Sequence, residues 1–128
     1  MSFDDSGSDF DLPVQQAIFD TKLTTLRRRG YLVSNTFRSL KDNARVGGKG
    51  YSQHLLGLAG DLDIRGLSPE QINEMIRAAR AQGLTVVTPE QEVALGHKPH
   101  VHVQAFRAGV VPKAVYRRQL GVQIQETP

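Results

Sequence analysis

Residues 52–64 read SQHLLGLAGDLDI, a stretch that mixes one histidine and two aspartates with glycine, alanine and leucine. From Ala59 to Ile64 apolar and polar residues alternate, which is typical of a short β-strand. His54 stands seven residues before Asp61, so one potential metal ligand precedes the strand and another lies within it. We therefore take this strand as the centre of the fold and as the first candidate for a functional site.

The residues before this stretch predict a helix, a strand and a loop. The helix starts near Asp11, has Pro13 in its first turn and ends at Gly30, as these residue types favour. A β-rich segment over 31–37 predicts a strand, and the glycines and polar residues of 38–51 predict a loop. We expect the buried stripe of the helix to hold its apolar residues at helical spacing, namely Val14, Ala17, Ile18 and Leu26.

The residues after the stretch predict two more strands and two more helices. Ser68-Pro69-Glu70-Gln71 is a capping box with proline at the first helical position, so a helix begins there and ends before Gly83. Further along we expect a strand over 84–88, a loop over 89–98, a strand over 100–106 and a short helix over 113–120. The predicted fold class is α+β, with a small, mainly antiparallel sheet and helices packed on one face.

Composition limits what the chain can be. Its 128 residues fit one domain, which we place at 11–109 between a flexible acidic arm at 1–10 and a basic C-terminal tail at 110–128. No run approaches the roughly 18 apolar residues of a membrane span. The acidic N-terminus lacks the basic and apolar regions of a secretory signal, so we expect no signal peptide.

Charge and cysteine content narrow the choice of site. The formal net charge is +3, but no aromatic residues interleave with the arginines, so we expect a solvated basic surface and not a nucleic-acid site. Cysteine is absent, which excludes disulfides, thiolate zinc sites and a cysteine nucleophile. Any metal site must therefore use histidine, aspartate or glutamate.

The remaining histidines cluster late in the chain. His97, His100 and His102 lie within six residues, and on a strand His100 and His102 point to the same side. Histidine and carboxylate are the ligands that zinc takes when no thiolate is present, and a catalytic site uses three of them with one position open. The histidines on the predicted strand, with His54 and Asp61, therefore form a candidate zinc site on the sheet.

The stretch SQHLLGLAGD at 52–61 resembles the S-x-H-x-x-G-x-A-x-D signature of the zinc D-Ala-D-Ala carboxypeptidases and the related L-alanyl-D-glutamate endopeptidases. The segment from Phe37 that precedes it is also similar, and the resemblance covers roughly residues 35–105. It implies that zinc is the cofactor and that His54 and Asp61 are two of its ligands. It further implies that Arg38 approaches the substrate carbonyl and the developing oxyanion, and that Ser52 supports the site.

The resemblance leaves the third zinc ligand open between two histidines. Many relatives place an acidic general base three residues before the ligand. If His100 is the ligand, His97 takes that place as the catalytic base, and this is the assignment we favour. If His102 is the ligand, Pro99 takes it, and His100 becomes the base or a neighbour of the ligands. Because the usual acidic residue is missing, Glu90 or Glu92 could also act from the preceding loop.

The resemblance implies hydrolysis of an amide bond in peptidoglycan peptides, by a zinc carboxypeptidase or endopeptidase. We expect a phage lysin that stays in the host cytoplasm until lysis, or a virion-associated peptidase with other virion proteins as partners. The alternative is a virion component that keeps the fold but has lost activity, which the missing acidic base favours and the intact His54, Asp61 and Arg38 oppose. Nucleic-acid binding would rest on the basic excess alone.

Overall fold

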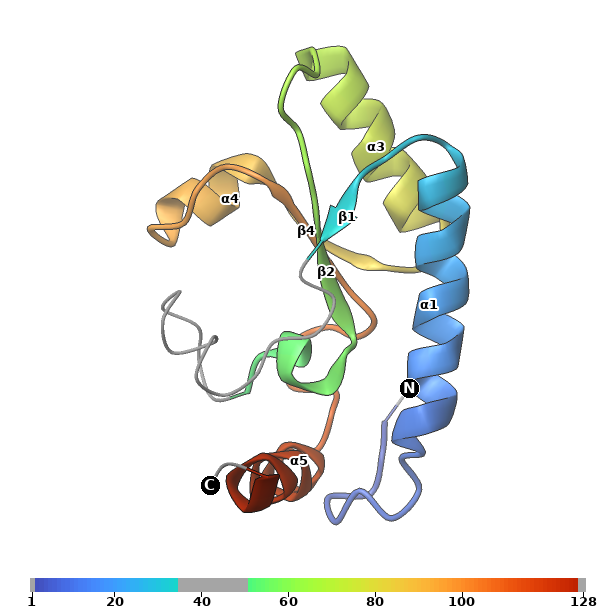
Figure 1. Cartoon of the computed structure of the whole chain (residues 1–128), viewed down its shortest axis with the longest axis vertical. Helices are drawn as coiled ribbons and strands as arrows, with labels where there is room; N and C mark the ends of the chain where they lie inside the picture. Colours follow the sequence, from blue (N-terminus) through green and yellow to red (C-terminus); the bar gives the residue numbers. More distant parts are fainter. Residues whose placement is uncertain (1, 35–50, 127–128) are drawn as a thin grey trace.

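The computed structural model describes residues 2–34 and 51–126, and Figure 1 shows how its elements are arranged. In chain order they are α1 (Leu12–Arg28), β1 (Val33–Ser34), the 3₁₀ turn η1 (Gln53–Leu56), β2 (Ala59–Leu62), α3 (Pro69–Ala81), β3 (Thr85–Val87), α4 (Pro89–Ala94), β4 (Val101–Gln104) and α5 (Lys113–Glu126). The predicted helices and strands are present among these residues, and β2, β3 and β4 are shorter than expected. The end of the strand predicted over 31–37 and nearly all of the loop predicted over 38–51 lie outside the described residues.

The four strands form one antiparallel sheet in the order β1-β2-β4-β3. Val101 and Val103 of β4 are buried in the core, whereas His102 and Gln104 alternate with them and face the other side. In Figure 1, α1 and α3 lie on one side of the sheet and the short α4 lies on the other. The small α+β fold with an antiparallel sheet, predicted from the sequence, is confirmed.

Helix α1 begins where expected but buries a different stripe. The Asp11 side chain accepts a hydrogen bond from the Val14 amide at the N-terminus of the helix. The expected stripe is wrong in part, because Val14 and Ile18 are 49% and 45% exposed. Leu26 is buried as expected, and it shares the core face with Phe19 and Leu23, which lie seven and three residues before it on the same side of the helix.

Two helices begin with the same capping chemistry. In α3 the Ser68 side chain accepts from the Gln71 amide while the Gln71 side chain accepts from the Ser68 amide, as the capping box predicts. Thr88 and Gln91 make the same two bonds in front of α4. The expected loop over 89–98 is therefore wrong in its first half, where the sequence TPEQ begins a helix.

The N-terminal segment folds back onto the core. The ring of Phe10 is buried and packs against Phe3 and Phe106 at centroid distances of 4.8 and 5.8 Å. Arg118 of α5 donates to the carbonyl oxygens of Ser6 and Gly7. These contacts attach residues 2–10, where the sequence predicted an arm, to Phe106 just after β4 and to α5.

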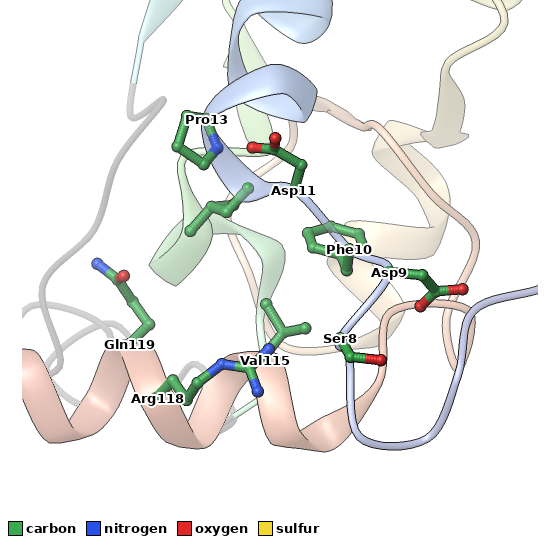
Figure 2. A pocket seen from close by; sticks show the side chains of 9 residues that line it. Ser8, Asp9, Phe10, Asp11, Pro13, Val115, Arg118 and Gln119 are labelled. Carbon is green, nitrogen blue, oxygen red and sulfur yellow. The ribbon is translucent and has the colours of Figure 1, made fainter.

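A pocket of about 500 Å³ lies between this segment and α5, away from the histidines. Figure 2 shows Arg118 and Gln119 of α5 facing Phe10 and Pro13 across it. Helix α5 extends further than the predicted 113–120 and contributes Val115 and Tyr116 to the core, where burial raises the pKa of Tyr116 to about 12. Among the described residues, every helix is too short or too polar to cross a membrane.

Candidate metal centre

The register of the sheet brings the two central site residues together. Strands β2 and β4 pair so that Asp61 lies directly opposite His102. Their side chains share one face of the sheet, and His102 Nδ1 lies 3.5 Å from Asp61 Oδ1. Two residues that are far apart in sequence therefore meet because of backbone pairing.

His54 reaches the same carboxylate from the turn before β2. Ser52 caps η1 by accepting a hydrogen bond from the His54 amide, and Gly57 ends the turn in the left-handed conformation, with φ of 66°. A side chain at Gly57 would be strained in that conformation and would also meet Gln16 Nε2 at 3.3 Å. The turn buries His54 to 2% exposure and sets its Nε2 atom 3.4 Å from Asp61 Oδ1.

These distances suit a zinc ion. Zinc bonds of about 2.0–2.2 Å at tetrahedral angles place neighbouring ligand atoms roughly 3.3–3.6 Å apart. The distances of 3.4 and 3.5 Å from Asp61 Oδ1 to the two histidine nitrogens fall in that range. The potential ligand atoms of His54, Asp61 and His102 all lie within 4.8 Å of one another. The three residues therefore fit a three-ligand site with one position left for a water or substrate.

Hydrogen bonds on the far sides of the rings fix which nitrogen is available. Gln104 Oε1 lies 2.8 Å from His102 Nε2, so Nε2 carries a proton and Nδ1 is the ring nitrogen that faces Asp61. The carbonyl oxygen of Lys98 lies 2.7 Å from His100 Nδ1, so a proton there leaves Nε2 facing the carboxylates. His102 on β4 and His100 just before it are therefore both held by hydrogen bonds on the ring nitrogen that faces away from Asp61.

A second group of acidic and basic side chains adjoins the first. Glu92 of α4 is 4% exposed, and its Oε2 atom lies 2.6 Å from His97 Nδ1 and 3.7 Å from His100 Nε2. His100 Nε2 also lies 3.2 Å from Asp61 Oδ1, so His100 stands between the two carboxylates. The potential ligand atoms of Glu92, His100 and His102 also lie within 4.8 Å of one another, and His102 thus belongs to both groups.

The charges of the site reinforce this arrangement. Burial alone would raise the pKa of Asp61, but hydrogen bonds with His100, His102 and His54 outweigh it and hold that pKa far below its usual value. The hydrogen bond to Asp61 raises the pKa of His100, although burial acts in the opposite direction. Asp61 therefore stays ionised at neutral pH, as a metal-binding carboxylate must.

The predicted site residues divide into three sets. His54, Asp61, His100 and His102 lie together around one carboxylate oxygen. His97 lies beside them with its Nδ1 atom on Glu92, and Ser52 acts as the cap of η1. Arg38 lies outside the described residues.

Three residues of the site received little or no weight from the sequence. Gln53 and Gln104 were missed, and the one available indication was that Gln53 directly precedes His54 and Gln104 stands two residues after His102 on the same strand. Glu92 was considered only as a member of a loop. The TPEQ capping box would have placed Glu92 on a helix, because the same pattern correctly predicted the start of α3.

Comparison with known proteins places the chain in a family. A family model described as Peptidase M15 matches residues 15–104, from α1 to the end of β4. No curated protein and no solved structure matches the chain in the same comparisons. The matched segment covers more than half of the 128 residues and includes all four histidines, Asp61 and Glu92. The resemblance found in the sequence is confirmed, and the chain belongs to the peptidase M15 family.

Proposed function

We propose that this chain hydrolyses an amide bond in the stem or cross-link peptides of peptidoglycan and uses zinc to do so. Membership of the peptidase M15 family supports a zinc-dependent metallopeptidase with peptidoglycan-type substrates. The observation that carries the proposal is the convergence of His54 Nε2 and His102 Nδ1 on Asp61 Oδ1 at 3.4 and 3.5 Å. These distances match the separations between ligand atoms around tetrahedral zinc.

For the third ligand we propose His102 in place of His100, the residue that the sequence favoured. His102 lies opposite Asp61 in the sheet and forms a group with both His54 and Asp61. Gln104 holds its second ring nitrogen, as partners of metal-binding histidines commonly do. His100 then adjoins the ligands, with its Nε2 atom directed at Asp61 and Glu92.

The residues beside the ligands can supply the proton transfers that amide hydrolysis needs. Bound zinc would polarise the substrate carbonyl and lower the pKa of an attacking water. We propose Glu92 as the group that accepts a proton from this water and returns it to the leaving amine nitrogen. His97 donates from Nδ1 to Glu92 Oε2 and so orients this carboxylate, a role that replaces the expected role of His97 as the base.

Glu92 also bears on the alternative that the chain is an inactive virion component. That alternative drew support from the missing acidic residue three positions before the ligand. A carboxylate that is 4% exposed and 3.7 Å from His100 Nε2 offers a replacement from a different element, which favours activity. Arg38 keeps the oxyanion-binding role that the resemblance implies, as a proposal.

The experiment that tests the function combines metal analysis with a cleavage assay. The purified protein should contain about one zinc per chain. Incubation with purified peptidoglycan should release new amino termini, and a chelator should stop the release until zinc is restored. A folded chain that cannot be loaded with zinc would end the proposal.

The products of the same digestion identify the bond. Release of free D-alanine would indicate carboxypeptidase action, whereas two peptide fragments from a cut inside the peptide would indicate endopeptidase action. The role as a phage lysin or virion-associated peptidase stays a prediction. Lysis of cells in which the protein is produced would support the role as a lysin. Recovery of the protein in purified phage particles would support the role as a virion-associated peptidase.

A further inference from the structure

The side chains of two glutamines form hydrogen bonds with the backbone of Phe106, a residue that follows β4. Gln53 Nε2 donates to the carbonyl oxygen of Phe106 at 2.5 Å, and the Phe106 amide donates to Gln53 Oε1 at 3.0 Å. Gln104 Nε2 donates to the same carbonyl oxygen at 2.6 Å. Gln53 directly precedes His54, and Gln104 contacts His102, so the backbone of Phe106 is linked to two residues of the metal centre.

The Phe106 carbonyl determines how the Gln104 amide is turned. A carbonyl oxygen can only accept, so the group that faces it must be the Gln104 NH₂. The Gln104 Oε1 atom must then face His102, where it too can only accept. His102 therefore carries a proton on Nε2, and Nδ1 is the ring nitrogen that faces Asp61 Oδ1, where its lone pair is available to a metal once any proton on Nδ1 is lost.

Contacts of the Phe106 ring and of the neighbouring backbone hold Phe106 in place. Its ring contacts Phe3 and Phe10 of the N-terminal segment at centroid distances of 5.6 and 5.8 Å. The preceding amide, of Ala105, donates to the Leu58 carbonyl at 2.8 Å and so ties this part of the chain to the start of β2. The carbonyl that orients Gln104 is thus fixed by contacts on both sides.

We propose that Gln104 is a positioning residue that selects the Nε2-protonated tautomer of His102 and so prepares its Nδ1 atom for zinc. The proposal rests on the zinc peptidase function proposed above. Outer hydrogen-bond partners of this kind typically contribute 10–100-fold to metal affinity. Gln104 touches no substrate in this role and acts through His102.

The test uses two variants and a matched control. Gln104→Leu removes the acceptor, while Gln104→Glu keeps an oxygen acceptor for His102 Nε2. Thr85→Val is the control, because Thr85 is the partner of Gln104 in the β3–β4 register. Like Gln104→Leu, this substitution replaces a polar side chain with an apolar one. Zinc affinity is measured by competition with a chromophoric chelator, and the tautomer of His102 by ¹⁵N NMR of the metal-free protein.

We expect Gln104→Leu to bind zinc about 10–100-fold more weakly than the parent and to show both tautomers of His102. Gln104→Glu should keep the Nε2-protonated tautomer, and Thr85→Val should match the parent in both measurements. A folded Gln104→Leu variant with parental zinc affinity would overturn the proposal. So would a parent His102 that is neutral and protonated on Nδ1 alone, a result that needs no variant to fold. Because the NMR measurement is made without metal, it separates failure of this proposal from failure of the zinc function.

Discussion

The two halves of the candidate metal centre are built in different ways. Asp61 and His102 meet through the pairing of β2 with β4, which joins residues about forty positions apart. Glu92 and His97 lie five residues apart and meet because α4 ends in a turn between them, where the His97 amide donates to the Glu92 carbonyl. The first half depends on the whole sheet, whereas the second depends on one short helix.

This difference suggests a division of labour. The sheet positions its residues through backbone hydrogen bonds, which do not depend on the side chains of the strands. It can therefore keep the metal ligands in place when other side chains are replaced. Glu92 of α4 is nearly fully buried, and its carboxylate contacts His97, which follows the helix, at 2.6 Å. We therefore expect changes in the sheet half to affect metal binding and changes in the α4 half to affect turnover.

The largest expected effect comes from removing a ligand in the sheet half. His54→Ala, Asp61→Ala and His102→Ala should each reduce zinc content from about one per chain to near zero, since two remaining ligands hold zinc poorly. His100→Ala should keep the zinc. Atomic absorption after dialysis provides the measurement. Zinc lost from His100→Ala but kept by His102→Ala would reverse the ligand assignment.

The next effect concerns the carboxylate of α4. Glu92→Gln keeps the size of the side chain and an oxygen for His97, but it cannot accept a proton. It should retain zinc and lower kcat by roughly 10²–10⁴-fold. Glu90→Gln is the control, because Glu90 is exposed in the same helical turn. Equal rates for the two variants would show that Glu92 is not the base.

A smaller effect should follow from loosening Glu92 without removing it. His97→Leu removes the donor that holds the carboxylate, whereas His97→Asn places an NH₂ group near the position of Nδ1. We expect His97→Leu to lower kcat by roughly 10–100-fold with little change in KM, and His97→Asn to restore much of the loss. If both variants are equally slow, the orienting hydrogen bond is not the reason.

The smallest effect compares the two capping boxes. Thr88→Ala and Ser68→Ala each remove one helix cap and should each cost about 1 kcal/mol in the free energy of unfolding. Only Thr88→Ala should also slow turnover, because α4 carries Glu92 and α3 carries no residue of the site. Chemical denaturation and kcat are measured side by side. A matching fall in kcat for Ser68→Ala would remove the distinction between the helices.

The sequence predicted the parts of this centre that depend on local patterns. The turn and strand at 52–64 carry a ten-residue signature, so His54 and Asp61 were assigned without knowledge of the fold. The start of α3 followed from its capping box in the same way. The identical pattern stands at Thr88 and predicts the start of α4 as well, in place of the loop expected there.

The choice between His100 and His102 could not be made from local patterns. The two residues share a face of the strand in any register, and only the pairing of β2 with β4 determines which of them lies opposite Asp61. The role of Gln104 likewise depends on a carbonyl that is held by Gln53, a residue more than fifty positions earlier. Such long-range contacts leave no periodic trace in the sequence.

The strand order also has a consequence for how the protein is made. β4 is the last strand in the chain, yet it lies between β2 and β3 and pairs with both. During synthesis, His54, Asp61 and Glu92 leave the ribosome before the strand that joins them. Until β4 arrives, β2 has one edge without its final partner and β3 waits for the strand it pairs with in the finished sheet, and such edges favour pairing with other chains. The centre therefore cannot be completed before β4 is made, and a nascent chain that stops near residue 95 would leave β2 open on one edge, β3 without its partner and the set of ligands incomplete.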